Sequence, residues 1–319
     1  MLGQMQIDSE GNIRDKVEIA VQRLKAFEPA DGYYVAFSGG KDSQCVYHLC
    51  EMAGVKFDAH YSVTSVDPPE LVRFIKENYP EVKFERQYDK NGKPITMWSL
   101  IPDRKMPPTR IVRYCCEELK ETNGAGRVTV TGVRKYESAR RKINHGVITI
   151  PKAGKKLMAE MENLDVDFTK TIRGGVVLNY DNDDKHRMME HCIRTGKALL
   201  NPIIDWEESD VWEFLNSNKI PHCCLYDEGF KRLGCIGCPM GRKKQKIELE
   251  RWPAYKKLYL KAFERMIKRR EEEGLENKQW ETAEDVMKWW LNLVEEDKPN
   301  NQGYGYLIER GPDDGNGKD

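Results

Sequence analysis

Short apolar runs alternate with stretches of helically spaced apolar residues over the first half of the chain. A helical stretch at 13–27 is ended by Pro29-Ala30-Asp31-Gly32. Further helical patterns lie at 44–53 and, framed by prolines, at 69–79. The strands predicted between them are 33–37, 57–64, 82–86, 127–133 and 147–150. This alternation predicts an α/β fold in which a mainly parallel sheet is covered by helices on both faces.

The second half of the chain has a weaker pattern until its last third. Residues 152–171 are charged and aperiodic, and we expect an excursion or lid there. Asp205 with Glu208 three residues on is a capping-box arrangement, which predicts that a helix starts at that point. The other elements expected are a strand at 172–179, a short helix at 183–194, and amphipathic helices at 252–273 and 280–295. The predicted regions are an N-terminal helix (1–30), a main α/β domain (31–245), a helical region (246–299) and a loose tail (300–319).

The segment Ser38-Gly39-Gly40-Lys41-Asp42-Ser43 joins the first predicted strand to the helix after it. Adjacent glycines let backbone N–H groups approach an anion, and Asp42 or Ser43 can cap the helix. The helix N-terminus adds free amides and the positive end of its dipole. The two serines contribute hydroxyl donors and Lys41 contributes a mobile charge. The segment is therefore predicted to hold a polyphosphate, largely by main chain.

Two known phosphate-binding loops have patterns close to that of residues 38–43. The Walker A pattern fails, because Val35 stands at its first glycine and Asp42 follows Lys41. The segment resembles the Ser-Gly-Gly-x-Asp-Ser signature of the PP-loop ATP pyrophosphatases, which cleave ATP between its α and β phosphates and transfer AMP to a substrate. An ordinary strand-to-helix turn is the alternative. The strand before the segment and the helix after it favour the nucleotide loop.

Composition narrows the class of protein. Lys plus Arg equals Asp plus Glu at 52 each, so net charge gives no reason to expect nucleic acid. The chain has no apolar run of membrane-spanning length and no signal-peptide core, so no membrane partner is expected and the cytoplasm is the expected location. Nine cysteines without an export signal are not expected to form a disulfide framework. Metal binding, catalysis or burial must account for them.

The cysteines include a candidate metal site. Cys115 and Cys116 are adjacent, and Cys235 and Cys238 have the two-residue spacing that lets both thiolates face one metal centre. A set of four thiolates suits either a [4Fe–4S] cluster or a structural Zn²⁺ ion. Plain burial is the alternative, since free cysteines behave as small hydrophobic residues.

The remaining cysteines are interpreted separately. Burial is favoured for Cys45, Cys50 and Cys192. Cys223 and Cys224 stay undecided between a metal ligand and a sulfur-carrying thiol.

A longer ordered set of motifs resembles the phosphoadenosine phosphosulfate (PAPS) reductase family of PP-loop proteins. Besides residues 38–43, the set is Val66-Asp67-Pro68-Pro69-Glu70, Arg113-Tyr114-Cys115-Cys116, Thr131-Gly132-Val133-Arg134 with Glu137-Ser138 and Arg140, Asn201-Pro202-Ile203 with Asp205-Trp206, and Leu225-Tyr226-Asp227-Glu228-Gly229-Phe230 leading to Gly234-Cys235-x-x-Cys238-Pro239. The resemblance implies an adenine nucleotide alpha hydrolase-like sheet, with a helical C-terminal region after it.

The resemblance also implies roles for residues. In the cluster-bearing adenylylsulfate reductases of the family, a Cys-Cys pair and a Cys-x-x-Cys pair hold a [4Fe–4S] cluster, which matches Cys115, Cys116, Cys235 and Cys238. The nucleotide-binding residues implied are Ser38, Gly39, Gly40, Lys41, Asp42, Ser43, Asp67, Gly132, Arg134 and Arg140. A solvated helix face is the alternative for Arg140-Arg141-Lys142, because charge runs are usually exposed.

One departure separates the chain from true sulfonucleotide reductases. Those enzymes attack the sulfate with a cysteine in a Glu-Cys-Gly-Ile/Leu-His tail, and no cysteine follows Cys238 here. The intact loop and this departure favour the branch that resembles the ATP pyrophosphatases of DNA phosphorothioation and RNA thiolation. That branch implies ATP with Mg²⁺, catalytic roles for Lys41, Asp42 and Arg134, a nucleic-acid acceptor, and a sulfur donor such as a cysteine desulfurase. Partner subunits are compatible with it.

Two other functions stay open. One is an adenylylsulfate or PAPS reductase that recruits a thiol from Cys223 or Cys224. The other is a cluster or zinc protein that uses the loop only as a nucleotide sensor. The basic run 242–246 suits phosphate contacts of a nucleic acid, but an ordinary helix surface would look the same.

Overall fold

The computed structural model describes residues 5–7, 13–151, 155–163, 168–171, 174–178, 198–241, 243–275 and 280–292. The helix expected at 183–194, Cys192 and the tail from residue 300 lie outside these ranges.

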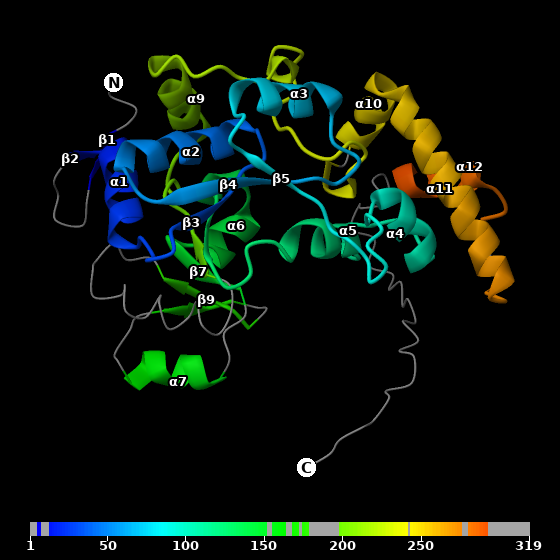
Figure 1. The fold of residues 1–319 in the computed structure, drawn as a ribbon, viewed down its shortest axis with the longest axis horizontal. Coiled ribbons are helices and arrows are strands. Elements are labelled where there is room, and N and C mark those ends of the chain that lie inside the picture. Colours follow the sequence, from blue (N-terminus) through cyan, green and yellow to red (C-terminus); the bar gives the residue numbers. More distant parts are fainter. Residues whose placement is uncertain are drawn as a thin grey trace.

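One large sheet organises the described residues (Figure 1). Its strand order is β5 (Lys83–Glu85), β4 (Phe57–Ser62), β3 (Tyr33–Ala36), β6 (Val128–Val130), β10 (Ala198–Leu200), β7 (Ile148–Ile150), β9 (Val176–Leu178) and β8 (Thr169–Lys170). The strands from β5 to β10 pair in parallel, and the pairings from β10 through β7 and β9 to β8 are antiparallel. The mostly parallel sheet is confirmed, with an antiparallel extension at one edge that contains the strand expected at 172–179.

Helices lie on both sides of the sheet. In Figure 1, α2 (Lys41–Ala53), α3 (Pro69–Asn78) and α9 (Glu208–Ser217) lie along one side of the strands, and α4 (Met97–Arg104) and α5 (Tyr114–Cys116) lie on the other. The expected cover on both faces is therefore present. Because β3 and β6 are parallel neighbours, the loops that follow them meet at one edge of the sheet, where α/β folds bind ligands.

The helix expected at 13–27 begins later than predicted. Residues Ile13–Asp15 form strand β2, which pairs with β1 (Met5–Ile7), and α1 is Lys16–Ala26. Asp15 caps α1 by accepting a hydrogen bond from Val17 N at 2.8 Å. Apolar residues at 13 and 17 are compatible with either a strand or a helix, so their spacing placed the start of the helix three residues too early.

Two predicted helix caps are wrong. Glu207, with Asp210, forms the capping box of α9, and Asp205 instead makes two hydrogen bonds of 3.0 Å to the guanidinium of Arg23. That partner lies on α1, far away in sequence, so local spacing could not identify it. At α2 the cap is Gly40, which has no side chain to donate or accept, and neither Asp42 nor Ser43 caps.

The charged stretch 152–171 contains a helix that its pattern did not predict. This helix is α7 (Lys155–Asn163). The amphipathic C-terminal helices are confirmed as α11 (Pro253–Glu272) and α12 (Ala283–Asn292), preceded by α10 (Lys244–Arg251). They join the main hydrophobic core, in which Trp290 is 1% exposed and donates its indole N–H to Pro108 O at 2.7 Å. None of the helices described is both long and apolar enough to cross a membrane.

Candidate active site and cysteine pocket

The turn from β3 into α2 is shaped by glycines. Gly39 has φ +71°, and a β-carbon there would lie 2.6 Å from Ile75 Cδ1. A β-carbon on Gly132, in the loop after β6, would lie 2.8 Å from the Asp42 carbonyl carbon. Both approaches are closer than any side chain allows. Glycine at 39 therefore lets the turn pack closely on α3, and glycine at 132 lets the loop after β6 approach the start of α2.

The serines close the turn on itself. Ser43 Oγ donates to Gly40 O at 2.9 Å and accepts from Ser38 N at 3.2 Å. The hydroxyls of Ser38 and Ser43 are 3.1 Å apart. The loop is thus held open around the N-terminal amides of α2, an arrangement that suits an anion. The structure brings together the loop residues that the sequence predicted.

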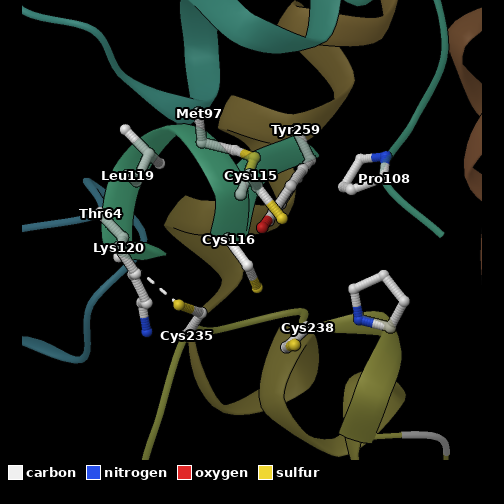
Figure 2. A pocket seen from close by; sticks show the side chains of 11 residues that line it. Thr64, Met97, Pro108, Cys115, Cys116, Leu119, Lys120, Cys235, Cys238 and Tyr259 are labelled. Carbon is white, nitrogen blue, oxygen red and sulfur yellow. Dashed lines mark hydrogen bonds between the residues drawn. The ribbon is translucent and has the colours of Figure 1, made fainter. Parts of the chain in front are cut away.

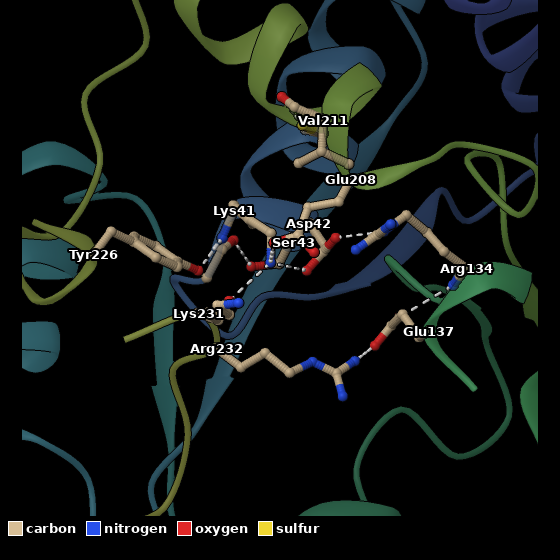
Figure 3. A network of polar contacts seen from close by, with 12 residues as sticks. Lys41, Asp42, Ser43, Arg134, Glu137, Glu208, Val211, Tyr226, Lys231 and Arg232 are labelled. Atoms are coloured by element: carbon tan, nitrogen blue, oxygen red, sulfur yellow. Dashed lines mark hydrogen bonds and ion pairs between the residues drawn. The ribbon is translucent and has the colours of Figure 1, made fainter. Parts of the chain in front are cut away.

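Lys41 is held inside the site rather than projecting into solvent. It is 1% exposed, and its Nζ donates to Lys231 O at 3.1 Å. The same atom lies 3.6 Å from carboxylate oxygens of both Asp42 and Glu208. Its backbone N–H donates to the Tyr226 hydroxyl at 2.8 Å, so that hydroxyl covers one amide of the loop (Figure 3).

Arg134 follows β6 and reaches the same loop. It is 3% exposed, and its Nε donates to Asp42 Oδ1 at 2.6 Å, as drawn in Figure 3. Arg134 Nη1 also donates to Trp206 O at 3.4 Å. The Asp42 carboxylate therefore faces two cations, Arg134 and Lys41. In this arrangement Asp42 fits an orienting partner of Arg134 better than a direct magnesium ligand.

Further charged residues lie beside Arg134. Arg141 and Arg232 both pair with the buried carboxylate of Glu137. Burial lowers the pKa of Arg141 and Arg232, and nearby Asp42 offsets part of that effect. Arg140 lies in α6 (Ala139–Asn144), but its side chain is outside the described part of the chain.

Sequence reasoning missed several of these partners. Glu208, Tyr226, Lys231 and Arg232 all contact residues of the loop or Glu137, yet each is far away in sequence from its partner. Tyr226 stands in a motif of the resemblance, which was the available signal for it. Glu208 was interpreted only as part of a capping box with Asp205, and Lys231 and Arg232 stand at positions that no spacing rule marks.

The four predicted metal-binding cysteines line one pocket (Figure 2). Cys115 and Cys116 end α5, where a π-helical turn (Glu117–Glu121) begins, a distortion common at functional sites. Cys235 and Cys238 stand in the opposite wall. Other residues in the lining are Thr64, Met97, Pro108, Leu119, Lys120, Pro239 and Tyr259. The structure therefore brings together thiols that are distant in the sequence.

Backbone contacts fix the wall that carries Cys235 and Cys238. Ile236 N donates to Val66 O at 2.7 Å, and Ile236 O accepts from the Tyr259 hydroxyl at 2.9 Å. Gly237 has φ +73°, and its N–H donates to Glu248 Oε2 at 2.8 Å. The turn is thus attached to both the sheet side and the C-terminal helices.

Asp67 is hydrogen-bonded to Thr64, a residue that lines the cysteine pocket. Its carboxylate accepts from Thr64 N at 2.8 Å and from Thr64 Oγ1 at 2.6 Å. Thr64 Oγ1 in turn accepts a hydrogen bond from Cys235 Sγ at 3.5 Å. Asp67 therefore supports the wall of the cysteine pocket through Thr64.

The thiols differ in their electrostatic surroundings. The hydrogen bond from Cys115, together with the positive charge of Arg113, lowers the pKa of Cys116 to about 5. The same hydrogen bond, together with burial, raises the pKa of Cys115. Burial raises the pKa of Cys238 to about 11. The sulfur of Cys235 raises the pKa of Lys120. The positive charges of Arg113 and Lys120 beside the pocket, and one thiol that deprotonates easily, suit a site whose ligands are thiolates.

The four cysteines have the chemistry required of a metal site with four thiolate ligands. Four thiols from two segments face one pocket, and soft sulfur ligands select zinc or iron–sulfur clusters. Among the described residues, however, no three His, Cys, Asp or Glu side chains form a group arranged to hold a metal ion. The thiols therefore share a pocket without forming a coordination shell.

Residues 32–241, which contain both the loop and the cysteine pocket, match the family described as the phosphoadenosine phosphosulfate reductase domain. The chain belongs to the PAPS reductase family. This match covers all eight described strands of the large sheet, α2 and all four cysteines of the pocket.

The relatives of this PAPS reductase family member either have low sequence identity or match only a short segment of it. An uncharacterized protein of Methanocaldococcus jannaschii is 26% identical over 244 residues, which are 73% of this chain and 46% of that protein. The adenosine 5'-phosphosulfate reductase of Neisseria meningitidis serogroup B is 42% identical over 64 residues, which are 20% of this chain and 26% of that enzyme. The chain thus spans less than half of the length of either relative.

A solved structure is also similar. The phosphoadenylyl-sulfate reductase of Candida auris, in a phosphate complex, has 12% sequence identity and a TM-score of 0.38. The similarity covers 73% of this chain and 98% of that one.

The two cysteines of the PAPS reductase domain that were considered as sulfur-carrying thiols differ in their exposure to solvent. Cys223 is buried and Cys224 is exposed. Burial raises the pKa of Cys223 to about 11, which disfavours its thiolate. Of the pair, Cys224 is thus the thiol that solvent can reach. Cys45 and Cys50 are buried in α2, as expected.

The basic run after the cysteines is only partly a surface. Residue 242 lies outside the described ranges, and Lys243 is exposed at the start of α10. Gln245 is 1% exposed, and its side-chain N–H donates to Gly237 O at 3.1 Å. This stretch of the PAPS reductase family member therefore supports the cysteine turn as well as presenting Lys243 to solvent.

Proposed function

We propose that the chain is a PP-loop ATP pyrophosphatase that adenylates an acceptor so that sulfur can be incorporated. The observation that carries the proposal is the turn from β3 to α2. There, glycine backbone, two hydroxyls, the N-terminus of α2 and the cations Lys41 and Arg134 converge on one small volume. An anion of high charge density is the ligand that such a volume favours.

The roles of the residues follow from their positions. The amides of 38–43 and the Lys41 ammonium hold the β and γ phosphates. Arg134, oriented by Asp42, stabilises the charge that develops around the α phosphorus. An acceptor oxygen attacks that phosphorus, the bond to the bridging β oxygen breaks, and pyrophosphate leaves. A sulfur nucleophile at the sulfide level then displaces AMP from the acceptor.

Mg²⁺ fits this scheme mainly through the nucleotide. Because the Asp42 carboxylate already faces Arg134 and Lys41, the triphosphate oxygens would supply most of its ligands. When bound, it neutralises phosphate charge. The protein cations act on the remaining charge.

We assign Cys115, Cys116, Cys235 and Cys238 as the ligands of a [4Fe–4S] cluster, with Zn²⁺ as the alternative. Their shared pocket supports the assignment. A cluster there would supply electron transfer or a bound sulfur atom, whereas zinc would supply only structure. Thr64 and the Gly237 backbone would position Cys235 and Cys238 in either case.

The acceptor we propose is a nucleic acid, as in DNA phosphorothioation or RNA thiolation, and the sulfur donor is a separate protein such as a cysteine desulfurase. Support comes from Arg141 and Arg232, which lie near Asp42 and Arg134, because phosphate backbones bind to such clusters of cations. Mass spectrometry of DNA and RNA nucleosides from cells with and without the gene tests this part. Loss of a thio-modified nucleoside in the deletion strain would identify the product.

The central test measures the products of ATP. Full-length protein with Mg²⁺, a sulfide source and candidate acceptors should yield AMP and pyrophosphate, and Ser38→Ala and Asp42→Ala should each lower the rate about 100-fold. Ser209→Ala, an exposed serine on α9, is the matched control and should react like wild type. Formation of ADP, or no affinity for ATP, would refute the proposal. ATP binding without turnover would instead indicate a nucleotide sensor.

A sulfonucleotide reductase is the second candidate. Its support is the 42% identity to the Neisseria meningitidis enzyme over 64 residues together with the cysteine pocket. Incubation with adenosine 5'-phosphosulfate or PAPS and a thioredoxin reductant distinguishes the two functions. Sulfite release that is lost in Cys224→Ser would establish the reductase, and the main proposal predicts no sulfite.

A further inference from the structure

A second hollow lies beside the nucleotide loop. Its volume is about 340 Å³, within the range of roughly 300–1,000 Å³ typical of small-molecule sites. Its walls come from α9 and from the segment that contacts Lys41, and its lining is Glu208, Trp212, Tyr226, Gly229, Phe230 and Lys231. Nothing in the reaction described above assigns a ligand to it.

Three aromatic side chains dominate this pocket. Trp212, Tyr226 and Phe230 are each partly exposed, so part of every ring is available to a ligand. The rings are also fixed in place. Trp212 packs edge-on against Tyr226 at 5.1 Å between centroids, and Phe230 packs on Trp252 at 5.4 Å. Rings that are held rigidly at a surface suit stacking with a planar ligand.

The pocket shares walls with the nucleotide loop. Tyr226 accepts from Lys41 N, and Lys231 O accepts from Lys41 Nζ. Glu208 lies 3.6 Å from the same Nζ, which is too long for a hydrogen bond, and its side chain is 56% exposed. An exposed carboxylate at this edge is an acceptor for a ligand's amino or ring N–H group.

We propose that this pocket binds a nucleobase, which stacks on Trp212 and Phe230 while Glu208 accepts a hydrogen bond from its edge. The proposal rests on the function above, because the base belongs either to ATP or to the acceptor nucleic acid. In both cases the shared walls place the base next to Lys41.

Fluorescence titration of the full chain with 2-aminopurine riboside tests the pocket, since stacking quenches this base. Wild type should show saturable quenching. Trp212→Ala and Phe230→Ala should each weaken binding about 5- to 100-fold, the range that stacking on one aromatic side chain contributes. Trp212→Phe should bind nearly as wild type, and Tyr88→Ala, an exposed aromatic residue elsewhere, should have no effect. Equal affinity of wild type, Trp212→Ala and Phe230→Ala would overturn the proposal.

A non-hydrolysable methylene analogue of ATP distinguishes the two sources. Quenching that persists at a saturating concentration of the analogue assigns the pocket to the acceptor base. Quenching that disappears assigns it to the adenine of ATP. Wild type that forms no pyrophosphate but shows Trp212-dependent quenching would refute the proposed function and keep the pocket. Pyrophosphate formation without Trp212-dependent quenching would refute the pocket alone.

Discussion

The nucleotide loop and the cysteine pocket are assembled in opposite ways. The loop is a contiguous segment, and hydrogen bonds among Ser38, Gly40 and Ser43 close it locally. The cysteine pocket joins two pairs of residues from distant segments, and its walls depend on contacts such as Ile236 to Val66 and Tyr259 to Ile236. A locally closed loop is preorganised for its ligand. A pocket made by packing would gain its final geometry only when the proposed metal centre binds, since binding and folding are coupled at such sites.

The largest expected effect tests whether the pocket holds a metal centre at all. Cys235→Ser in anaerobically prepared protein should reduce iron and acid-labile sulfide, or zinc, to about a tenth or less of wild type. Because distant sites are usually independent, affinity for ATP should stay within about twofold. Elemental analysis and calorimetry measure the two quantities. Cys224→Ser, an exposed thiol outside the pocket, should retain its metal, and loss of metal there would contradict the assigned ligands.

The next effect concerns the loop alone. Gly132→Ala should weaken ATP binding about 5- to 100-fold, because the new methyl group forces the start of α2 to move, a cost of roughly 1–3 kcal/mol. Metal content should not change. Gly234→Ala is the matched control, because a β-carbon at Gly234 meets only open space. Unchanged ATP affinity in Gly132→Ala would show that the contact with Asp42 does not shape the site.

A smaller effect of opposite sign is expected at Tyr226. Its hydroxyl covers the Lys41 amide, and a bound phosphate oxygen must displace it. Tyr226→Phe should therefore raise the affinity for pyrophosphate about two- to tenfold, the equivalent of one hydrogen bond. Isothermal titration with pyrophosphate measures this. Weaker binding in the variant would mean that the hydroxyl contacts the ligand instead of competing with it.

The smallest effect tests the hydrogen bonds through which Thr64 supports the cysteine pocket. Thr64→Val removes the hydroxyl that joins Asp67 to Cys235 and should lower the free energy of unfolding by about 1–3 kcal/mol. Thr64→Ser keeps the hydroxyl and should lose less. Urea denaturation measures both variants. If ATP affinity fell by more than about twofold in Thr64→Val, the two regions would not be independent.

The sequence predicted those parts of the molecule that depend on nearby residues. The strands around the loop, the glycine turn itself and the amphipathic helices α11 and α12 follow from local spacing. The cysteine pairs were recognisable for the same reason, because each pair is a short motif. Resemblance to a family then joined the two pairs, which spacing alone could not do.

The errors share a physical cause. Asp205 has the spacing of a helix cap, yet its carboxylate pairs with Arg23 on α1. Asp42 has the position of a helix cap, yet its carboxylate accepts a hydrogen bond from Arg134 in the loop after β6. Lys41 meets Tyr226 and Lys231 only after the chain has folded. Polar side chains with several possible partners are decided by tertiary structure, which single-sequence patterns do not contain.

The stretch that begins at Tyr226 and ends at Cys238 has a consequence for protein engineering. It touches Lys41 at one end and carries half of the thiols at the other. Transplanting the glycine turn into a foreign scaffold would leave its lysine without the carbonyl that aims it. A usable graft would have to carry this stretch as well, and the recipient would then inherit a turn with two thiols whether or not its designer wanted them.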